Sequence, residues 1–134
     1  MTAADRATYR RGLEGLGRGS WAWLEPDGTW GWSNAGLITD GDRSLLVDTL
    51  YDSKMTAAML AGMRRATPAA ARIDILVNSH ADGDHTYGNR LVEAARIITS
   101  EATAREFFNL PPQKAQTIVD NAEILGEGAR YIAG

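Results

Sequence analysis

The sequence predicts an α/β fold, and three observations indicate it. An apolar run at residues 73–77 is typical of a buried strand, and residues 53–66 carry apolar side chains at helical spacing. Two Asp-Gly pairs separate strand-like segments earlier in the chain, as they do in β-hairpins. The 134-residue chain has 44% hydrophobic and 23% charged residues, which is ordinary for a globular protein. We therefore expect residues 1–134 to form a single domain.

The segment before residue 50 is predicted to contain a short helix and three strands. Residues 4–16 favour a helix, although several glycines loosen its end. Residues 21–25 and 29–39 are expected to be strands around Pro26-Asp27-Gly28, a hairpin signal. A further strand is expected at 43–48, after the second Asp-Gly pair.

The middle of the chain predicts a helix from Ser53 to Ala66. Ser53 is a favourable N-cap residue, and Pro68 prevents the helix from continuing. Three methionines fall four residues apart on this helix, and we interpret them as core residues rather than as metal ligands: Met55, Met59 and Met63.

The remainder of the chain predicts alternating helices and strands. After the strand at 73–77 we expect a short helix at 89–95 and a strand at 96–99. Ser100 is expected to cap a helix that runs to Phe108. A last helix is expected to begin at Pro111 and Pro112 and to end at Gly126.

The segment after the strand at 73–77 contains four potential metal ligands at close spacing: His80, Asp82, Asp84 and His85. Both histidines of the chain lie here. On an extended backbone His80, Asp82 and Asp84 would point to one side, and a bend at Gly83 would let His85 join them. Imidazole nitrogens together with carboxylate oxygens suit a divalent ion such as zinc, manganese or iron. The alternative is a polar loop with an Asp-Gly turn and two incidental histidines.

This segment resembles the metal-binding motif of the metallo-β-lactamase superfamily, His-x-His-x-Asp-His at the end of a strand. His80, Asp84 and His85 match the motif in place. Asp82 stands where the family usually has histidine, so the chain carries a His-x-Asp-x-Asp-His variant, similar to that of the competence-type DNA-uptake proteins.

Two further segments resemble the same family. Residues 44–49 are similar to the family strand that ends in an aspartate bracing the metal loop, here Asp48. Asp48 could instead be a simple turn residue at the end of its strand. Thr86-Tyr87-Gly88-Asn89 is similar to the hydrolase and polyketide-cyclase-like branches of the superfamily.

The resemblance implies an αββα sandwich of which this chain covers only about the N-terminal half. Family members are longer, and their second half supplies further histidine and aspartate ligands, whereas no histidine follows His85. Residues 1–134 are therefore expected to be a partial domain, either a piece of a longer protein, a truncated reading frame or one chain of a split protein.

The resemblance also implies a metal-dependent hydrolase. In the family pattern His80 and Asp82 hold one ion, Asp84 and His85 hold the other, and Asp84 orients the nucleophile. A metal-bound hydroxide would attack an ester, thioester, lactam, lactone or phosphoester of a small-molecule substrate. Zinc is the expected ion, and the added carboxylate of Asp82 shifts preference towards manganese or iron. The isolated chain is expected to be weakly active or inactive. Alternatives are a non-catalytic half-domain that acts in assembly, or a polyketide-cyclase-like relative.

Four tryptophans lie between Trp21 and Trp32. A two-residue turn at Asp27-Gly28 would place Trp23 opposite Trp32 and all four on one face, whereas a three-residue turn would split them between the faces. These rings could pack between sheet and helices, which we favour. They could also form an aromatic wall that holds an apolar substrate beside the metal.

Charge and composition restrict the partners. The formal net charge of −3 gives no reason to expect a nucleic acid or an anionic membrane surface as partner. The chain has no cysteine, so a disulfide framework and a thiolate site are excluded. It has no signal-peptide pattern and no apolar run of membrane length, and we expect it in the cytoplasm. Half a sandwich would expose one sheet face, including Leu46, Ile75 or Val77 and the tryptophans. We therefore expect a homodimer or association with the missing C-terminal half.

Overall fold

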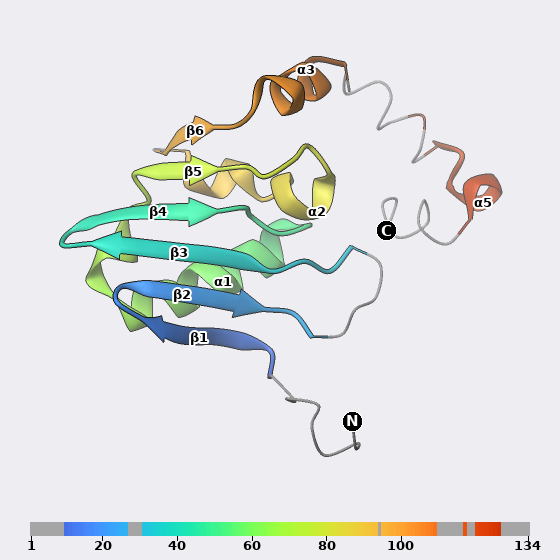
Figure 1. The fold of residues 1–134 in the computed structure, drawn as a ribbon. Helices are drawn as coiled ribbons and strands as arrows, with labels where there is room; N and C mark the ends of the chain where they lie inside the picture. The colour runs from blue at the N-terminus through green and yellow to red at the C-terminus, as the bar shows by residue number, and fades with distance from the viewer. Residues whose placement is uncertain (1–9, 27–30, 94, 110–116, 118–119, 127–134) are drawn as a thin grey trace, which may run out of the picture. The chain divides into compact units, whose positions relative to one another are not determined.

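The computed structural model describes residues 10–26, 31–93, 95–109, 117 and 120–126. The chain divides into two compact units, residues 1–99 and 100–134. The first unit is built on one six-stranded sheet with the strand order β1-β2-β3-β4-β5-β6 (Figure 1). Its strands are β1 (Gly12–Gly17), β2 (Ser20–Leu24), β3 (Ala35–Asp40), β4 (Arg43–Val47), β5 (Ile75–Val77) and β6 (Arg96–Ile98). The predicted α/β class is confirmed.

The sheet changes from antiparallel to parallel at β4. Strands β1 to β4 pair antiparallel with their neighbours, whereas β4, β5 and β6 pair parallel. Asp40 pairs with Arg43, so a two-residue connection joins β3 to β4, and Gly41 takes the φ of +61° that this tight connection requires. Parallel strands need a longer crossover, and helix α1 (Ser53–Ala66) provides it between β4 and β5.

The predicted helix at 4–16 is wrong over its described part, because residues 12–17 form β1. This strand pairs with β2, and Leu13 lies opposite Trp23. The glycines that weaken a helix are tolerated here because the neighbouring strand supplies the backbone hydrogen bonds. Residues 4–9 lie outside the described part of the chain.

The predicted tight hairpin after β2 is also wrong. Trp23 pairs with Ala35, so residues 25–34 form a long connection between β2 and β3, of which 27–30 are not described. Trp32 lies in this connection rather than in a strand, and neither predicted arrangement of the tryptophans occurs. Trp21 and Trp23 share the helix-covered face of the sheet and pack on its core, which agrees with the packing interpretation for these two rings.

A buried carboxylate holds the base of this connection. Trp23 Nε1 donates a hydrogen bond to Glu25 Oε1 at 2.9 Å, and Arg11 Nε forms an ion pair with Glu25 Oε2 at 2.6 Å. The backbone N–H of Glu25 donates to Asn34 Oδ1 at 2.8 Å. The Arg11 guanidinium also lies 5.0 Å from the centre of the Trp32 ring. These contacts fix both ends of the connection between β2 and β3.

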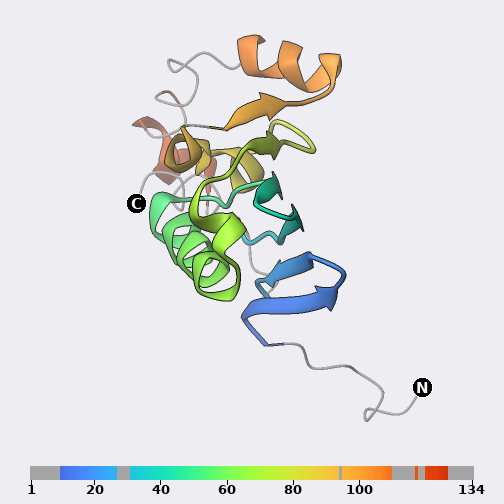
Figure 2. The same ribbon diagram turned by 90° about the vertical axis from the view of Figure 1, so that its left-hand side faces the viewer.

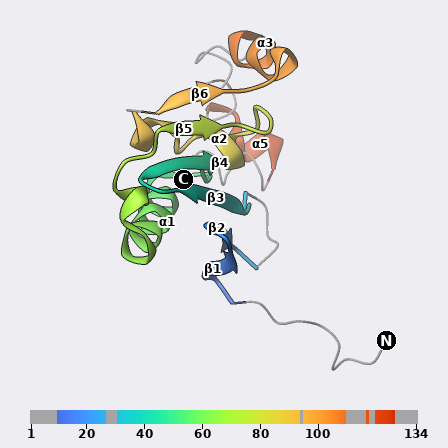
Figure 3. The same cartoon turned by 60° about the vertical axis from the view of Figure 1, so that its left-hand side comes forward.

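Helix α1 covers one face of the sheet, as Figures 1, 2 and 3 show from different sides. Its end at Ala66 matches the prediction, but its N-cap is Asp52 rather than Ser53, and the Asp52 side chain accepts a hydrogen bond from Met55 N at 2.6 Å. Aspartate and serine are similarly favourable N-cap residues, so either residue could cap this helix. The three methionines are buried in the core as predicted: Met55, Met59 and Met63.

The two faces of the sheet differ in their cover. On the α1 side, which we call the closed face, Leu37, Leu46 and Leu76 are paired across neighbouring strands and are 0% exposed. The opposite side, which we call the open face, is formed by the alternate residues: Ala22, Gly36, Ile38, Leu45, Val47, Ile75, Val77 and Ile98. The expectation that Leu46 would be exposed is wrong, because its register places it under α1, whereas Ile75 and Val77 lie on the open face.

Short helical segments complete the first unit: η2 (Pro68–Ala71), α2 (Gly83–Thr86) and η3 (Asn89–Val92). Val92 belongs to the core under the closed face. The strand predicted at 73–77 and the helix predicted at 89–95 are both shorter than expected, and α2 was not predicted.

The second unit contains α3 (Glu101–Asn109) and α5 (Ala122–Leu125). Ser100 Oγ accepts a hydrogen bond from Thr103 N at 3.2 Å, which confirms the predicted cap. Gly126, with φ of +96°, ends α5 as predicted, while most of the helix predicted at 111–126 lies outside the described residues. Among the described helices, none has the length and apolar character that a membrane crossing requires.

Candidate metal centre

The predicted metal ligands follow β5, at the end of the sheet where β4 also stops. Because β4 and β5 are parallel, their carboxyl ends meet at the same edge. Backbone hydrogen bonds continue past both strands, from Asp48 N to Val77 O at 2.9 Å and from Asn78 N to Ile98 O at 3.0 Å. The loop after β5 is therefore anchored on both sides where it leaves the sheet.

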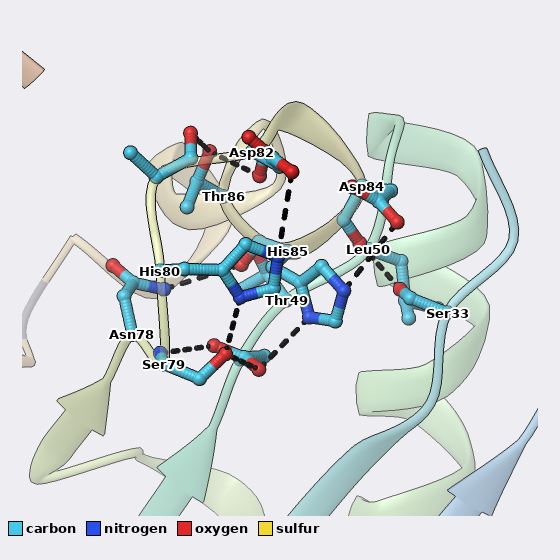
Figure 4. Close-up of polar contacts among 12 residues, drawn as sticks. Ser33, Thr49, Leu50, Asn78, Ser79, His80, Asp82, Asp84, His85 and Thr86 are labelled. Atoms are coloured by element: carbon cyan, nitrogen blue, oxygen red, sulfur yellow. Dashed lines mark hydrogen bonds and ion pairs between the residues drawn. The ribbon is translucent and has the colours of Figure 1, made fainter. Parts of the chain in front are cut away.

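The second part of this loop is a single helical turn, α2, rather than an extended segment. Tyr87 N donates to Gly83 O at 2.9 Å and His85 N donates to Asp82 O at 3.0 Å, which closes the single turn α2. The predicted alternation of side chains along an extended segment does not occur. Instead the turn brings Asp84 and His85 back towards His80, as Figure 4 shows. A Cβ atom at Gly83 would lie 2.4 Å from the Tyr87 ring, so a larger residue there would require this half-exposed ring to move.

Three of the four predicted ligands come together. His80, Asp84 and His85 each offer one ligand atom, and these atoms all lie within 4.8 Å of one another. His85 Nε2 lies 3.4 Å from Asp84 Oδ2. Asp82 borders this group, with Oδ2 at 3.6 Å from His80 Nε2, but its side chain is 76% exposed. The geometry therefore brings three potential ligands together, and Asp82 lies at the edge of this group.

Asp48 braces the loop through its carboxylate. Oδ1 accepts a hydrogen bond from Ser79 N at 2.7 Å, and Oδ2 accepts one from Ser79 Oγ at 2.6 Å. Oδ2 also lies 2.9 Å from Nδ1 of His85. The backbone of Asp48 has φ of +62°, a conformation that aspartate tolerates better than most residues. The predicted bracing role is confirmed by these contacts, and engagement of Nδ1 leaves Nε2 of His85 to face the other ligands.

A buried amide network beneath the loop fixes the backbone of His85, and its residues were missed in the sequence. The carbonyl of His85 accepts hydrogen bonds from Thr49 N at 3.0 Å and from Asn78 Nδ2 at 3.2 Å. Asn89 joins the two donors, since its Oδ1 accepts from Thr49 Oγ1 at 2.9 Å and its Nδ2 donates to Asn78 Oδ1 at 2.8 Å. The sequence did contain one signal for Asn89, because the segment Thr86-Tyr87-Gly88-Asn89 resembles the family.

The connection between β2 and β3 also reaches the loop. The Ser33 hydroxyl donates a hydrogen bond to the backbone carbonyl of Asp84. Trp32 precedes Ser33 and packs partly against the core. Trp30, which the aromatic-wall interpretation also needs, lies outside the described residues. The wall therefore stays a prediction, whereas the contact of Ser33 with the loop is established.

The donor set fits a divalent ion. Two imidazoles and one carboxylate are a frequent protein ligand set of zinc, with a further position left for water or substrate. The Nδ1 atom of each histidine has a hydrogen-bonding neighbour, so the Nε2 atoms are the ones available for coordination. The carboxylates of Asp48, Asp82 and Asp84 favour a cation at this edge of the sheet.

Comparison with known proteins agrees with this geometry. A family model described as the metallo-beta-lactamase superfamily matches residues 28–131. A search of curated proteins finds no match.

Solved structures of similar fold include a metallo-beta-lactamase from Hirschia baltica, with a TM-score of 0.59 and 24% identity over 74% of this chain and 48% of that chain. The DIM-1 metallo-beta-lactamase exposed to ceftazidime has a TM-score of 0.59 and 16% identity over 72% of this chain and 46% of that one. TMB-1 has a TM-score of 0.58 and 18% identity over 75% and 48%. This chain thus spans about half the length of these structures.

Proposed function

The chain belongs to the metallo-beta-lactamase superfamily, and from this premise we propose that it is part of a metal-dependent hydrolase whose cation is held by His80, Asp84 and His85. The observation that carries the proposal is the convergence of these three side chains within 4.8 Å at the carboxyl ends of β4 and β5. A divalent cation bound there would acidify a water molecule and polarise an oxygen atom of the substrate.

The residues around the proposed cation have separate roles. His80 and His85 supply neutral nitrogen ligands, and Asp48 keeps His85 oriented through Nδ1 at 2.9 Å. We assign Asp84 the further role of orienting the attacking water. A carboxylate only accepts hydrogen bonds, so a water that donates to Asp84 directs a lone pair away from it and towards the substrate.

Zinc is the ion we propose, with manganese and iron as alternatives. Two imidazoles favour zinc among these three ions. Asp82 lies 3.6 Å from His80 Nε2 and can add a second carboxylate, which would favour the harder ions. The substrate we propose is a small molecule with an ester, thioester, lactam, lactone or phosphoester bond, because those bonds are cleaved by an activated water.

One observation favours assembly as a second function. The open face presents aliphatic side chains at the sheet surface, and Ile38 is 50% exposed. The chain also spans only about half the length of the matched structures. We therefore propose that a second polypeptide, either another copy or a chain carrying the rest of the fold, covers this face.

The test of the metal site is calorimetric titration of the full chain with zinc and with manganese. We expect His80→Ala, His85→Ala and Asp84→Ala each to weaken binding by at least about tenfold, because each removes a direct ligand. Asp82→Ala should weaken it less. Asp40→Ala is the matched control, since it removes a carboxylate from the last residue of β3, at the opposite end of the sheet. Unchanged affinity in both histidine variants would contradict the assignment.

Hydrolysis is measured on the same preparations with ester, thioester, lactam, lactone and phosphoester substrates. We expect slow turnover that a chelator abolishes and that added zinc restores. Turnover that resists the chelator would overturn the metal-dependent mechanism while leaving the binding result intact.

A further inference from the structure

Ser79 lies between the aspartate that braces the loop and the more exposed of the two histidines. Its backbone N–H and its hydroxyl both contact Asp48, at 2.7 and 2.6 Å. The same hydroxyl oxygen lies 2.8 Å from Nδ1 of His80. One side chain therefore touches the brace and a metal ligand at the same time, as Figure 4 shows for Ser79 and His80.

The single proton of this hydroxyl decides which way each hydrogen bond runs. The carboxylate of Asp48 only accepts, and an O···O separation of 2.6 Å requires a proton between the two oxygens. The Ser79 hydroxyl therefore donates to Asp48. It has no second proton to give to His80, so Nδ1 of His80 must carry the hydrogen and donate to Ser79 Oγ.

We propose that Ser79 is a positioning residue that fixes His80 in the tautomer with hydrogen on Nδ1, leaving the lone pair of Nε2 for the cation. Asp48 does the same for His85 by direct contact at 2.9 Å. The carboxylate of Asp48 thus fixes the tautomer of both imidazoles, that of His85 directly and that of His80 through Ser79. The inference deepens the proposed function, because it rests on the assignment of His80 as a ligand.

His80 needs this support more than His85 does. Its side chain is 43% exposed, whereas that of His85 is 20% exposed. In the exposed position, water competes for both ring nitrogens, and packing restrains the ring less. Removal of the Ser79 hydroxyl leaves Nδ1 of His80 without the acceptor shown by the structure. The hydrogen can then move to Nε2, where it blocks coordination.

The test reads the tautomers directly in the metal-free chain, by long-range proton–nitrogen correlation spectra of the imidazoles at a pH at which both rings are neutral. The chain has two histidines, so the spectrum contains four ring nitrogens. We expect both rings to show a protonated Nδ1 in the wild type. In Ser79→Ala, His80 should shift towards a protonated Nε2 while His85 keeps its pattern. Ser79→Thr retains the hydroxyl and should restore the wild-type spectrum of His80.

Zinc titration of the same three proteins provides the second measurement. We expect Ser79→Ala to weaken zinc binding about 10- to 100-fold, the usual range for a residue that orients a ligand, and Ser79→Thr to bind as the wild type does. An unchanged His80 tautomer in Ser79→Ala, or a changed tautomer with unchanged affinity, would overturn the role of Ser79. Absence of zinc binding by the wild type would instead refute the proposed metal site, and the tautomer spectra would still decide the part concerning Ser79.

Discussion

The closed and open faces of the sheet are built from the same strands but are covered differently. Along β4, Leu45 points to the open face and is half-buried, while its neighbour Leu46 points under α1 and is 0% exposed. Both faces carry large aliphatic side chains, so the difference lies in what packs on them rather than in composition. Around Leu37, Leu46 and Leu76 the closed face is fully buried, although Ile97 of β6 on the same face is 50% exposed. The open face has the composition of a core without comparable burial.

The largest expected effect comes from shortening the two adjacent leucines. Leu46→Ala should lower the free energy of unfolding by about 3 kcal/mol, because it leaves a cavity under α1. Leu45→Ala removes the same atoms from the open face and should cost about 1 kcal/mol or less, since part of that surface is already in water. Urea denaturation of both variants measures the difference. Equal losses would mean that the open face is covered in solution.

A smaller effect is expected from adding a methyl group to each face. A Cβ atom at Gly62 of α1 would lie 2.9 Å from the buried Trp23 ring, whereas one at Gly36 on the open face would meet Val47 at an ordinary 3.7 Å. Gly62→Ala should therefore destabilise the protein by about 1 kcal/mol, as overpacking outweighs the gain in helix propensity. Gly36→Ala should be close to neutral. Thermal unfolding of the two variants checks this, and a stabilised Gly62→Ala would show that α1 can move off the sheet.

The smallest effect on stability, but a clear effect on association, is expected from charge on the open face. Ile38 is 50% exposed, so Ile38→Lys should change the free energy of unfolding by only about 0.5 kcal/mol. The wild type should associate in light-scattering measurements, and Ile38→Lys should shift it towards the monomer. Lys54→Ala, at an exposed position of α1 on the other side of the sheet, is the control for a surface change. A monomeric wild type that binds no hydrophobic dye would remove the case for a partner.

The sequence was informative where local patterns decide structure. Residues 53–66 carry their apolar spacing and their proline stop within the segment itself, so the bounds of α1 could be predicted. The order of β4, α1 and β5 followed from the resemblance of residues 44–49 and 80–85 to the family. For the site, the three side chains that converge and the bracing Asp48 could be identified in advance, while their role as metal ligands stays a proposal.

The predictions that were wrong concern segments whose structure depends on contacts with other parts of the chain. Residues 12–17 form a strand only because β2 pairs with them, so their own helical tendency was misleading. The register of Trp23 with Ala35 excludes a two-residue hairpin connection between β2 and β3, which the Asp-Gly signal had favoured. The extended loop expected to align Asp82 with the other side chains is not observed, because α2 begins at Gly83, while the ligand role of Asp82 itself stays a prediction.

The bracing contacts of Asp48 join segments that are distant in sequence. Its carboxylate contacts residues 31 and 37 positions later in the chain, and these contacts exist only when β4, α1 and β5 are assembled. An unfolded chain still contains His80 and His85, but no contact holds their rings in the positions needed to bind one cation. A cation would therefore select the assembled state, and occupancy at about 100 times the dissociation constant would add about 2.7 kcal/mol to its stability. Metal binding would therefore stabilise the folded state of this chain, independently of its role in hydrolysis.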